Sequence, residues 1–183
     1  MSEIQTLPTL QELFSDVEIT KKVDAFQTIM NANPPTTWVK KHPFISNYLY
    51  LPIDKVEYLL QKIFKTFKIE VLKTGMLLNA VEVTVRVHYK HPVTGEMLFH
   101  DGVGAQELQT KKDTGNLSLD MSNLNKGALI MALPMAKTTA IKDACDHFGA
   151  VFGANLNRKD SINYTGDSIL QKIDINKIKE QNS

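Results

Sequence analysis

Four polar side chains alternate with apolar ones along residues 80–90, at a spacing that suits phosphate binding. If this segment is a β-strand, side chains of one face recur every second residue, at about 6.6 Å. That interval roughly follows successive phosphates of an extended nucleic-acid strand, which basic side chains bind. The alternative is an ordinary solvated strand face. The four side chains belong to Thr84, Arg86, His88 and Lys90.

A second group of candidates combines aromatic and basic residues. Residues 38–44 read WVKKHPF, so that Trp38 beside Lys40 and Lys41 would allow base stacking next to phosphate contact. A lone tryptophan beside prolines is also typical of a plug at a helix or subunit junction. The remaining basic candidates for nucleic-acid binding are Lys65, Lys137, Lys142, Arg158 and Lys159.

Enzyme signatures are not found in the sequence. It has no P-loop, no nucleophile elbow, and no paired-cysteine or H-E-x-x-H metal pattern. Because His88 and His100 fall on strands that should pair, a small enzyme centred on these two histidines is one alternative. His100 and Asp101, however, are adjacent on a strand, so they point to opposite faces and would not converge on one ion. We therefore expect no catalytic residue, no metal site and no cofactor.

The apolar pattern changes from a helical period to a strand period along the chain. Residues 53–67 place apolar side chains on one helical face, whereas residues 80–90 alternate strictly, as in a half-buried antiparallel strand. The sequence therefore predicts an α+β fold: a three-stranded antiparallel β-meander packed on a long closing helix, a β-β-β-α core with preceding helices. Further expected elements are a helix at 20–30, strands at 67–72 and 96–103, a turn at 91–95 and a long polar loop at 106–126.

The closing helix is expected to begin after Pro134 and to carry one apolar stripe. Side chains spaced three or four residues apart share a helix face, which must pack on another element. Gly153 is expected to cap the end in a left-handed conformation, before an asparagine-rich, charged exit. The stripe consists of Ile141, Ala144, Cys145, Phe148 and Phe152.

Residues 135–160, MAKTTAIKDACDHFGAVFGANLNRKD, resemble the closing helix of the annealing domain in the Rad-fifty-two family of single-strand annealing proteins. Residues 81–87 and 99–104 resemble that family's central strand pair and the glycine turn leaving it, in the same order. The resemblance covers roughly residues 50–160. In size the chain is similar to the compact bacteriophage recombinases of this family, and it lacks the long partner-binding tail of the eukaryotic relatives.

The resemblance implies a function and partners. Family members bind single-stranded DNA in a basic groove around a ring of subunits, with contacts from the hairpin sheet and the closing helix. They pair complementary strands without ATP, in recombination and repair. For this chain the resemblance implies a homo-oligomer, ring or filament, that works beside an exonuclease and a single-strand binding protein in the cytoplasm of a bacterial host.

Some residues of this chain match functional positions of the family, and others do not. Lys137 aligns with a basic position of the family motif, and the glycines Gly102, Gly104 and Gly153 match positions where backbone geometry matters. Where the family presents two adjacent basic residues for DNA, however, this sequence has Asp146 and His147. An aspartate repels phosphate. Either the groove is built from Arg86, Lys90 and Lys137 instead, or the alignment is shifted in this helix.

Composition sets wider limits on the function. The 183 residues carry a formal net charge of +1, so the chain is not uniformly polybasic, although the segment from Lys40 to Lys90 holds nine basic and four acidic residues. Its single cysteine excludes an intrachain disulfide, and no signal peptide or membrane-spanning run is found. We expect one domain over residues 1–173 and a flexible tail over 174–183. The main alternative to DNA annealing is a structural scaffold that reuses the fold and does not bind DNA.

Overall fold

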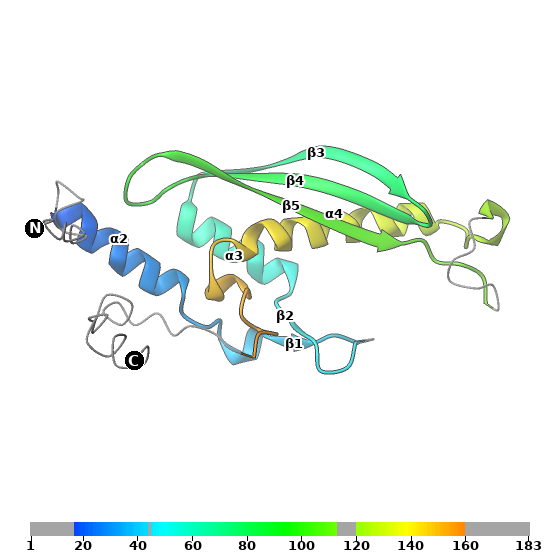
Figure 1. Cartoon of the computed structure of the whole chain (residues 1–183), viewed down its shortest axis with the longest axis horizontal. Helices are drawn as coiled ribbons and strands as arrows, with labels where there is room; N and C mark the ends of the chain where they lie inside the picture. Colours follow the sequence, from blue (N-terminus) through cyan, green and yellow to red (C-terminus); the bar gives the residue numbers. More distant parts are fainter. Residues whose placement is uncertain (1–16, 44, 113–119, 160–183) are drawn as a thin grey trace, which may run out of the picture.

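The fold is a three-stranded sheet covered on one face by helices. The computed structural model describes residues 17–43, 45–112 and 120–159, so the expected tail at 174–183 lies outside the described residues. The sheet consists of β3 (Phe67–Leu77), β4 (Ala80–Lys90) and β5 (Met97–Glu107), antiparallel and in that order. The long helix α4 (Ala128–Asp146) lies along the sheet (Figure 1). The predicted α+β class and β-meander are confirmed.

Strand β4 separates an inner from an outer face of the sheet. Its odd-numbered residues from Val81 to Tyr89 are buried, and its even-numbered residues are partly or fully exposed. This is the alternation expected of a strand with one face in the core. Arg86 faces Glu70 of β3 and Asp101 of β5 in the register, so these three side chains share the outer face. The turn from β4 to β5 uses Gly95 at φ 74°, a left-handed conformation that favours glycine.

The inner face is covered very closely by α4. A stripe of alanines at four-residue spacing lies against β4 and β5, and two glycines of β5 lie beneath it. A Cβ atom on Gly102 would lie 2.3 Å from the carbonyl oxygen of Ala140, and one on Gly104 equally close to that of Ala136. Asp143 of α4 also accepts a hydrogen bond from the Val103 amide on the open edge of β5, at 2.9 Å. The buried stripe is Ala128, Ala132, Ala136, Ala140 and Ala144.

The closing helix begins and ends earlier than the sequence predicted. It starts at Ala128 and runs through Pro134, and it ends at Asp146. Gly149, at φ 124°, then interrupts the helix, and a short 3-10 helix, η3 (Ala150–Phe152), follows. Gly153 has the predicted left-handed conformation, at φ 106°, but it ends η3 instead of α4. The predicted stripe residues are nonetheless all buried, because η3 folds back into the same core.

Two helices complete the core beside α4. They are α2 (Val17–Met30) and α3 (Ile53–Phe64), close to the predicted ranges, although Phe67 belongs to β3 and not to the helix. Phe64 of α3 lies 4.5 Å from Phe148 and 4.8 Å from Tyr89, measured between ring centroids. This aromatic cluster joins α3, β4 and the segment after α4.

Between α2 and α3, the chain forms a small separate hairpin. The 3-10 helix η1 (Thr36–Trp38) comes first, and the short paired strands β1 (Lys40–Lys41) and β2 (Leu49–Tyr50) form the hairpin. In Figure 1 the hairpin lies near the segment that leaves η3, on the side of α4 away from the sheet.

Strands β3 and β5 are both longer than the sequence predicted. Strand β3 continues five residues beyond the predicted end at 72, past a bulge between Val71 and Lys73. Strand β5 continues to Glu107, so the connection to α4 is shorter than predicted, and it holds the 3-10 helix η2 (Met121–Asn123) and a bridge between Thr110 and Leu124. In the part of the chain that the structure describes, no helix is long and apolar enough to cross a membrane.

Candidate nucleic-acid interface

The outer sheet face holds the predicted Arg86, but its charge is paired. The Arg86 guanidinium donates two hydrogen bonds to the Asp101 carboxylate, at 2.7 and 2.8 Å, and its Cζ lies 3.9 Å from the centroid of the Phe99 ring. This bidentate pair lowers the pKa of Asp101 below its usual value, so Asp101 stays charged at neutral pH. A phosphate would have to compete with Asp101 for the guanidinium.

Other basic side chains on the outer face also have acidic partners. His88 Nε2 lies 2.9 Å from a carboxylate oxygen of Glu70, and the Lys73 ammonium lies 3.0 Å from Glu82. Lys68 adds a further contact to Glu70 at 3.7 Å. The outer face therefore alternates in charge and is not uniformly basic.

The other predicted residues lie in separate places. Lys90 and Lys65 are exposed at the same end of the sheet, since the Lys90 amide donates to the carbonyl of Thr66 at 3.1 Å. Lys137 is exposed on α4. Trp38 packs edge-on against Tyr58 of α3, with ring centroids 5.7 Å apart, and is partly buried against the core. This position matches the alternative of a tryptophan at a helix junction.

Five predicted basic residues lie on three segments that meet at β2. Lys40 and Lys41 are exposed on β1, and Arg158 and Lys159 are exposed after η3. The two groups are connected through β2, because the side chain of Asn157 makes two hydrogen bonds, each 2.8 Å, with the backbone of Leu49. Lys142 of α4 completes the group. We name these residues the basic corner: Lys40, Lys41, Lys142, Arg158 and Lys159.

Aromatic rings lie within the basic corner. Tyr50 pairs with Lys40 across the hairpin, and the Lys142 ammonium lies 4.8 Å from the centroid of the Tyr50 ring. The ring of His42 meets those of Tyr48 and Tyr50 edge-on, with centroids 5.9 and 6.0 Å apart. Tyr48 is 43% exposed, which leaves part of a ring open for stacking. Cations beside exposed rings are the combination that binds single-stranded nucleic acid without sequence preference.

Asp146 is a negatively charged residue close to two cations of the basic corner, Lys142 and Arg158. Loss of surrounding water, and then the negative charge of Asp143, raise the pKa of Asp146 to about 6, although Lys142 and Arg158 act in the other direction. Loss of water in turn lowers the pKa of Lys142. Asp146, which stands where the annealing family has a basic residue according to the resemblance, is therefore largely neutralised below about pH 6.

Replacing Asp146 with asparagine should stabilise the protein near neutral pH. The folded-state pKa lies above the ordinary value of 3.8, so the native state binds more protons between about pH 4 and 6, and this group's contribution to stability falls as pH rises through that range. We expect the melting temperature of Asp146→Asn to exceed that of the wild type above about pH 6 and to equal it below about pH 4. A constant difference across the range would contradict the raised pKa.

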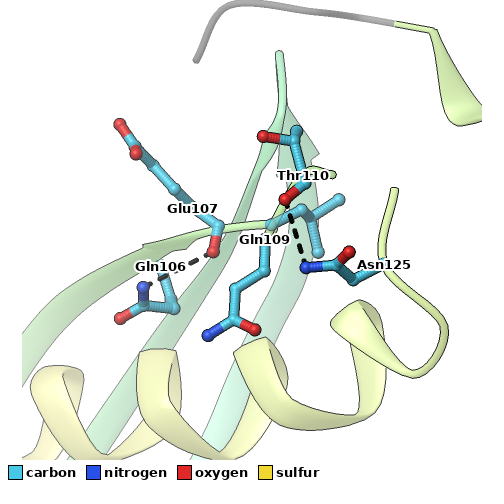
Figure 2. A pocket seen from close by; sticks show the side chains of 6 residues that line it. Gln106, Glu107, Gln109, Thr110 and Asn125 are labelled. Carbon is cyan, nitrogen blue, oxygen red and sulfur yellow. Dashed lines mark hydrogen bonds between the residues drawn. The ribbon is translucent and has the colours of Figure 1, made fainter. Parts of the chain in front are cut away.

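A cavity lies away from the basic corner, where β5 ends (Figure 2). Its volume is about 320 Å³, and side-chain amides and a threonine surround it, with Asn125 donating to the carbonyl of Thr110 at 3.1 Å. One carboxylate, that of Glu107, and no cation line the cavity, so it is poorly suited to phosphate. It is lined by Gln106, Glu107, Leu108, Gln109, Thr110 and Asn125.

The histidines do not form a common site. His88 lies on the outer face with Glu70, whereas His100 lies on the inner face, where its Nε2 is 3.1 Å from the Tyr89 hydroxyl and its ring stacks on His147. Loss of water lowers the pKa of His100, which favours the neutral imidazole. Within residues 17–43, 45–112 and 120–159, no group of three or more histidine, cysteine, aspartate or glutamate residues could hold a metal ion.

Comparison with known protein families finds none that matches the chain, and comparison with curated proteins finds no significant match. The resemblance to the annealing family therefore depends on residues 81–87, 99–104 and 135–160 alone. Sequence reasoning named Lys142 as a basic candidate but missed Tyr50 and Asn157 as parts of the same site. The mixture of aromatic and basic residues in 38–44 was the sequence signal for this region.

Proposed function

We propose that the protein binds single-stranded DNA and anneals complementary strands without ATP, as a compact member of the Rad-fifty-two class of recombinases. The observation that carries the proposal is the basic corner, where β1, α4 and the segment after η3 bring cations to β2, whose Tyr50 ring contacts Lys142. The β-β-β-α order, which the resemblance implies, is a second support.

The proposed mechanism requires no covalent chemistry. Lysine and arginine side chains of the basic corner neutralise phosphates and release counterions, which gives sequence-independent affinity. Stacking on Tyr48 and Tyr50 would hold the strand extended, so that free base edges meet a complementary strand. Holding one strand in place in this way lowers the entropic cost of pairing with the second.

A homo-oligomer is part of the proposal, and its support is the apolar surface. Large apolar side chains are exposed along the free edge of β3 and on the first half of α4, where Ile130 is 78% exposed. Exposed strand edges and extended apolar surfaces are typical of association sites. A second copy of the chain is the partner we propose for them. The exposed residues are Val71, Leu72, Met76, Leu77, Leu78, Leu129, Ile130, Met131, Leu133 and Met135.

Two substitutions on the outer face test whether the sheet also contacts DNA. If Arg86 binds phosphate, Arg86→Ala should weaken single-strand affinity by about threefold to tenfold, and Asp101→Ala should strengthen it, because it frees the guanidinium. Affinity should be measured by fluorescence anisotropy with a labelled oligothymidine. Lys90→Ala in the Arg86→Ala background extends the test to the end of the strand. Unchanged affinity in this double variant would exclude the outer face as a DNA contact.

The alternative is a structural oligomer that does not bind DNA. The ion pairs of the outer face favour it, since Arg86, His88 and Lys73 already have acidic partners. Salt separates the two functions. A DNA binder should lose single-strand affinity steeply between about 50 and 200 mM salt, whereas a scaffold has no affinity to lose.

The decisive experiment is annealing of two complementary fluorescent oligonucleotides without ATP, together with light scattering of the protein. Accelerated annealing by a large oligomer would support the proposal. No acceleration and no single-strand binding at low salt would contradict it and favour the scaffold.

A further inference from the structure

Asn157 binds the edge of β2 in the way that a neighbouring strand would. Its Oδ1 accepts a hydrogen bond from the Leu49 amide at 2.8 Å, and its Nδ2 donates to the Leu49 carbonyl at 2.8 Å, across 108 positions of the sequence. A side-chain amide provides one acceptor and two donors, so it can satisfy both backbone groups at once. Aspartate has the same shape but lacks the donor, and its charge would lie against the Leu49 carbonyl.

The chain is held on both sides of this contact. Before it, Leu156 packs against the hydrophobic core, and its amide donates to the carbonyl of Gly153 at 3.1 Å. After it, the Arg158 amide donates to the carbonyl of Asn155 at 3.2 Å, which continues the turn. Asn157 therefore fixes the direction in which Arg158 and Lys159 leave the core.

The direction of the segment after Asn157 matters because β1, β2 and the end of α4 lie nearby. Leu49 pairs with Lys41 of β1, and the Asn157 contact places the segment after η3 at the other edge of β2. The charge of Arg158 is also felt at Asp146, near the end of α4. Basic segments distant in sequence thus flank β2 on both of its edges.

We propose that Asn157 is a positioning residue for DNA binding: its two bonds to Leu49 hold Arg158 and Lys159 on one side of β2, across from Lys40 and Lys41 of β1, so that one DNA strand that crosses β2 can meet cations on both sides. This inference rests on the proposed function. It assigns Asn157 no contact with DNA. Without the two bonds, Arg158 and Lys159 keep their charge but lose their fixed place, and binding them to phosphate then costs conformational entropy.

A double-mutant cycle tests this role. The variants are Asn157→Ala, the double substitution of Arg158 and Lys159 by glutamine, and the combination of both. Single-strand affinity is measured by anisotropy with an oligothymidine between about 50 and 200 mM salt. We expect Asn157→Ala to lower affinity by about threefold to tenfold and to make the salt dependence shallower. In the Asn157→Ala background, the glutamine substitutions should have little further effect.

Controls separate positioning from stability and from the proposed function. Asn155→Ala changes another asparagine of the same segment and leaves its backbone carbonyl in place, so it should bind like the wild type. Asn157→Asp should bind no better than Asn157→Ala, since it cannot make both bonds and its charge repels phosphate. Additive effects in the cycle, or a lower melting temperature with unchanged affinity and salt slope, would overturn the inference while DNA binding stands. A wild-type protein that does not bind the oligothymidine would overturn both.

Discussion

Phe148→Ala should lower the free energy of unfolding by about 3 to 5 kcal/mol, the usual cost of removing a buried phenylalanine. The ring is 8% exposed and lies at the centre of the aromatic cluster. Its centroid is 4.5 Å from that of Phe64, 4.8 Å from Tyr89 and 5.0 Å from Phe152. The cluster joins α3, the sheet and η3, so the cavity would open where three parts of the core meet.

Urea unfolding followed by circular dichroism measures this loss, and Phe99→Ala is the matched control. Phe99 is 52% exposed on the outer face, where it contacts Arg86, and its replacement should cost less than about 1 kcal/mol. Equal losses in the two variants would show that Phe148 is not part of the core. Because η3 and the segment after it pack on the same cluster, Phe148→Ala should also weaken DNA binding.

The central strands could be predicted from sequence because their two faces differ chemically. The alternation of valines with polar residues along β4 sets the strand, its faces and the outward direction of Arg86. In β3, by contrast, Thr74 and Gly75 resemble the start of a turn, yet pairing with β4 continues past them. Neighbouring strands decided the length of β3, and local preference did not.

The bounds of α4 were predicted wrongly for two physical reasons. Pro134 is often a helix-start signal, but here it lies inside the helix, and the alanine stripe that begins at Ala128 was the better indicator. The apolar spacing also continues smoothly to Phe152, although Gly149 at φ 124° cannot belong to a helix. The periodicity predicted which side chains are buried and did not reveal that the backbone changes direction.

The basic corner could not be predicted because its contacts are distant in sequence. Lys142 meets Tyr50, and Asn157 meets Leu49, through folding of the whole chain and not through any local spacing. Lys40, Lys41, Lys142, Arg158 and Lys159 were separate candidates in the sequence, whereas the fold brings their three segments together at β2. For Arg86 and His88, the regular spacing predicted correctly that they share one strand face. It could not predict their acidic partners, which lie on other strands.

Replacing four cations of the basic corner by glutamine should reduce single-strand affinity by roughly 30- to 900-fold, provided each phosphate contact contributes about 0.5 to 1 kcal/mol. The variant combines Lys40→Gln, Lys41→Gln, Lys142→Gln and Arg158→Gln. Glutamine keeps part of each apolar stem and so preserves packing on neighbours such as Tyr50. With four fewer phosphate contacts, the slope of log affinity against log salt should become shallower by about 2 to 3.

A second fourfold variant controls for net charge. Glutamine at the exposed positions Lys22, Lys62, Lys112 and Lys126 removes the same charge from other surfaces. If DNA binding depended on the field of the whole molecule, the two variants would lose affinity equally. If the basic corner is the binding site, the control should keep its salt slope and most of its affinity, and only the corner variant should fail to accelerate annealing. Equal losses would therefore contradict the assignment of the site, because long-range charge is screened within about 10 Å at 0.1 M salt and only local contacts survive that screening.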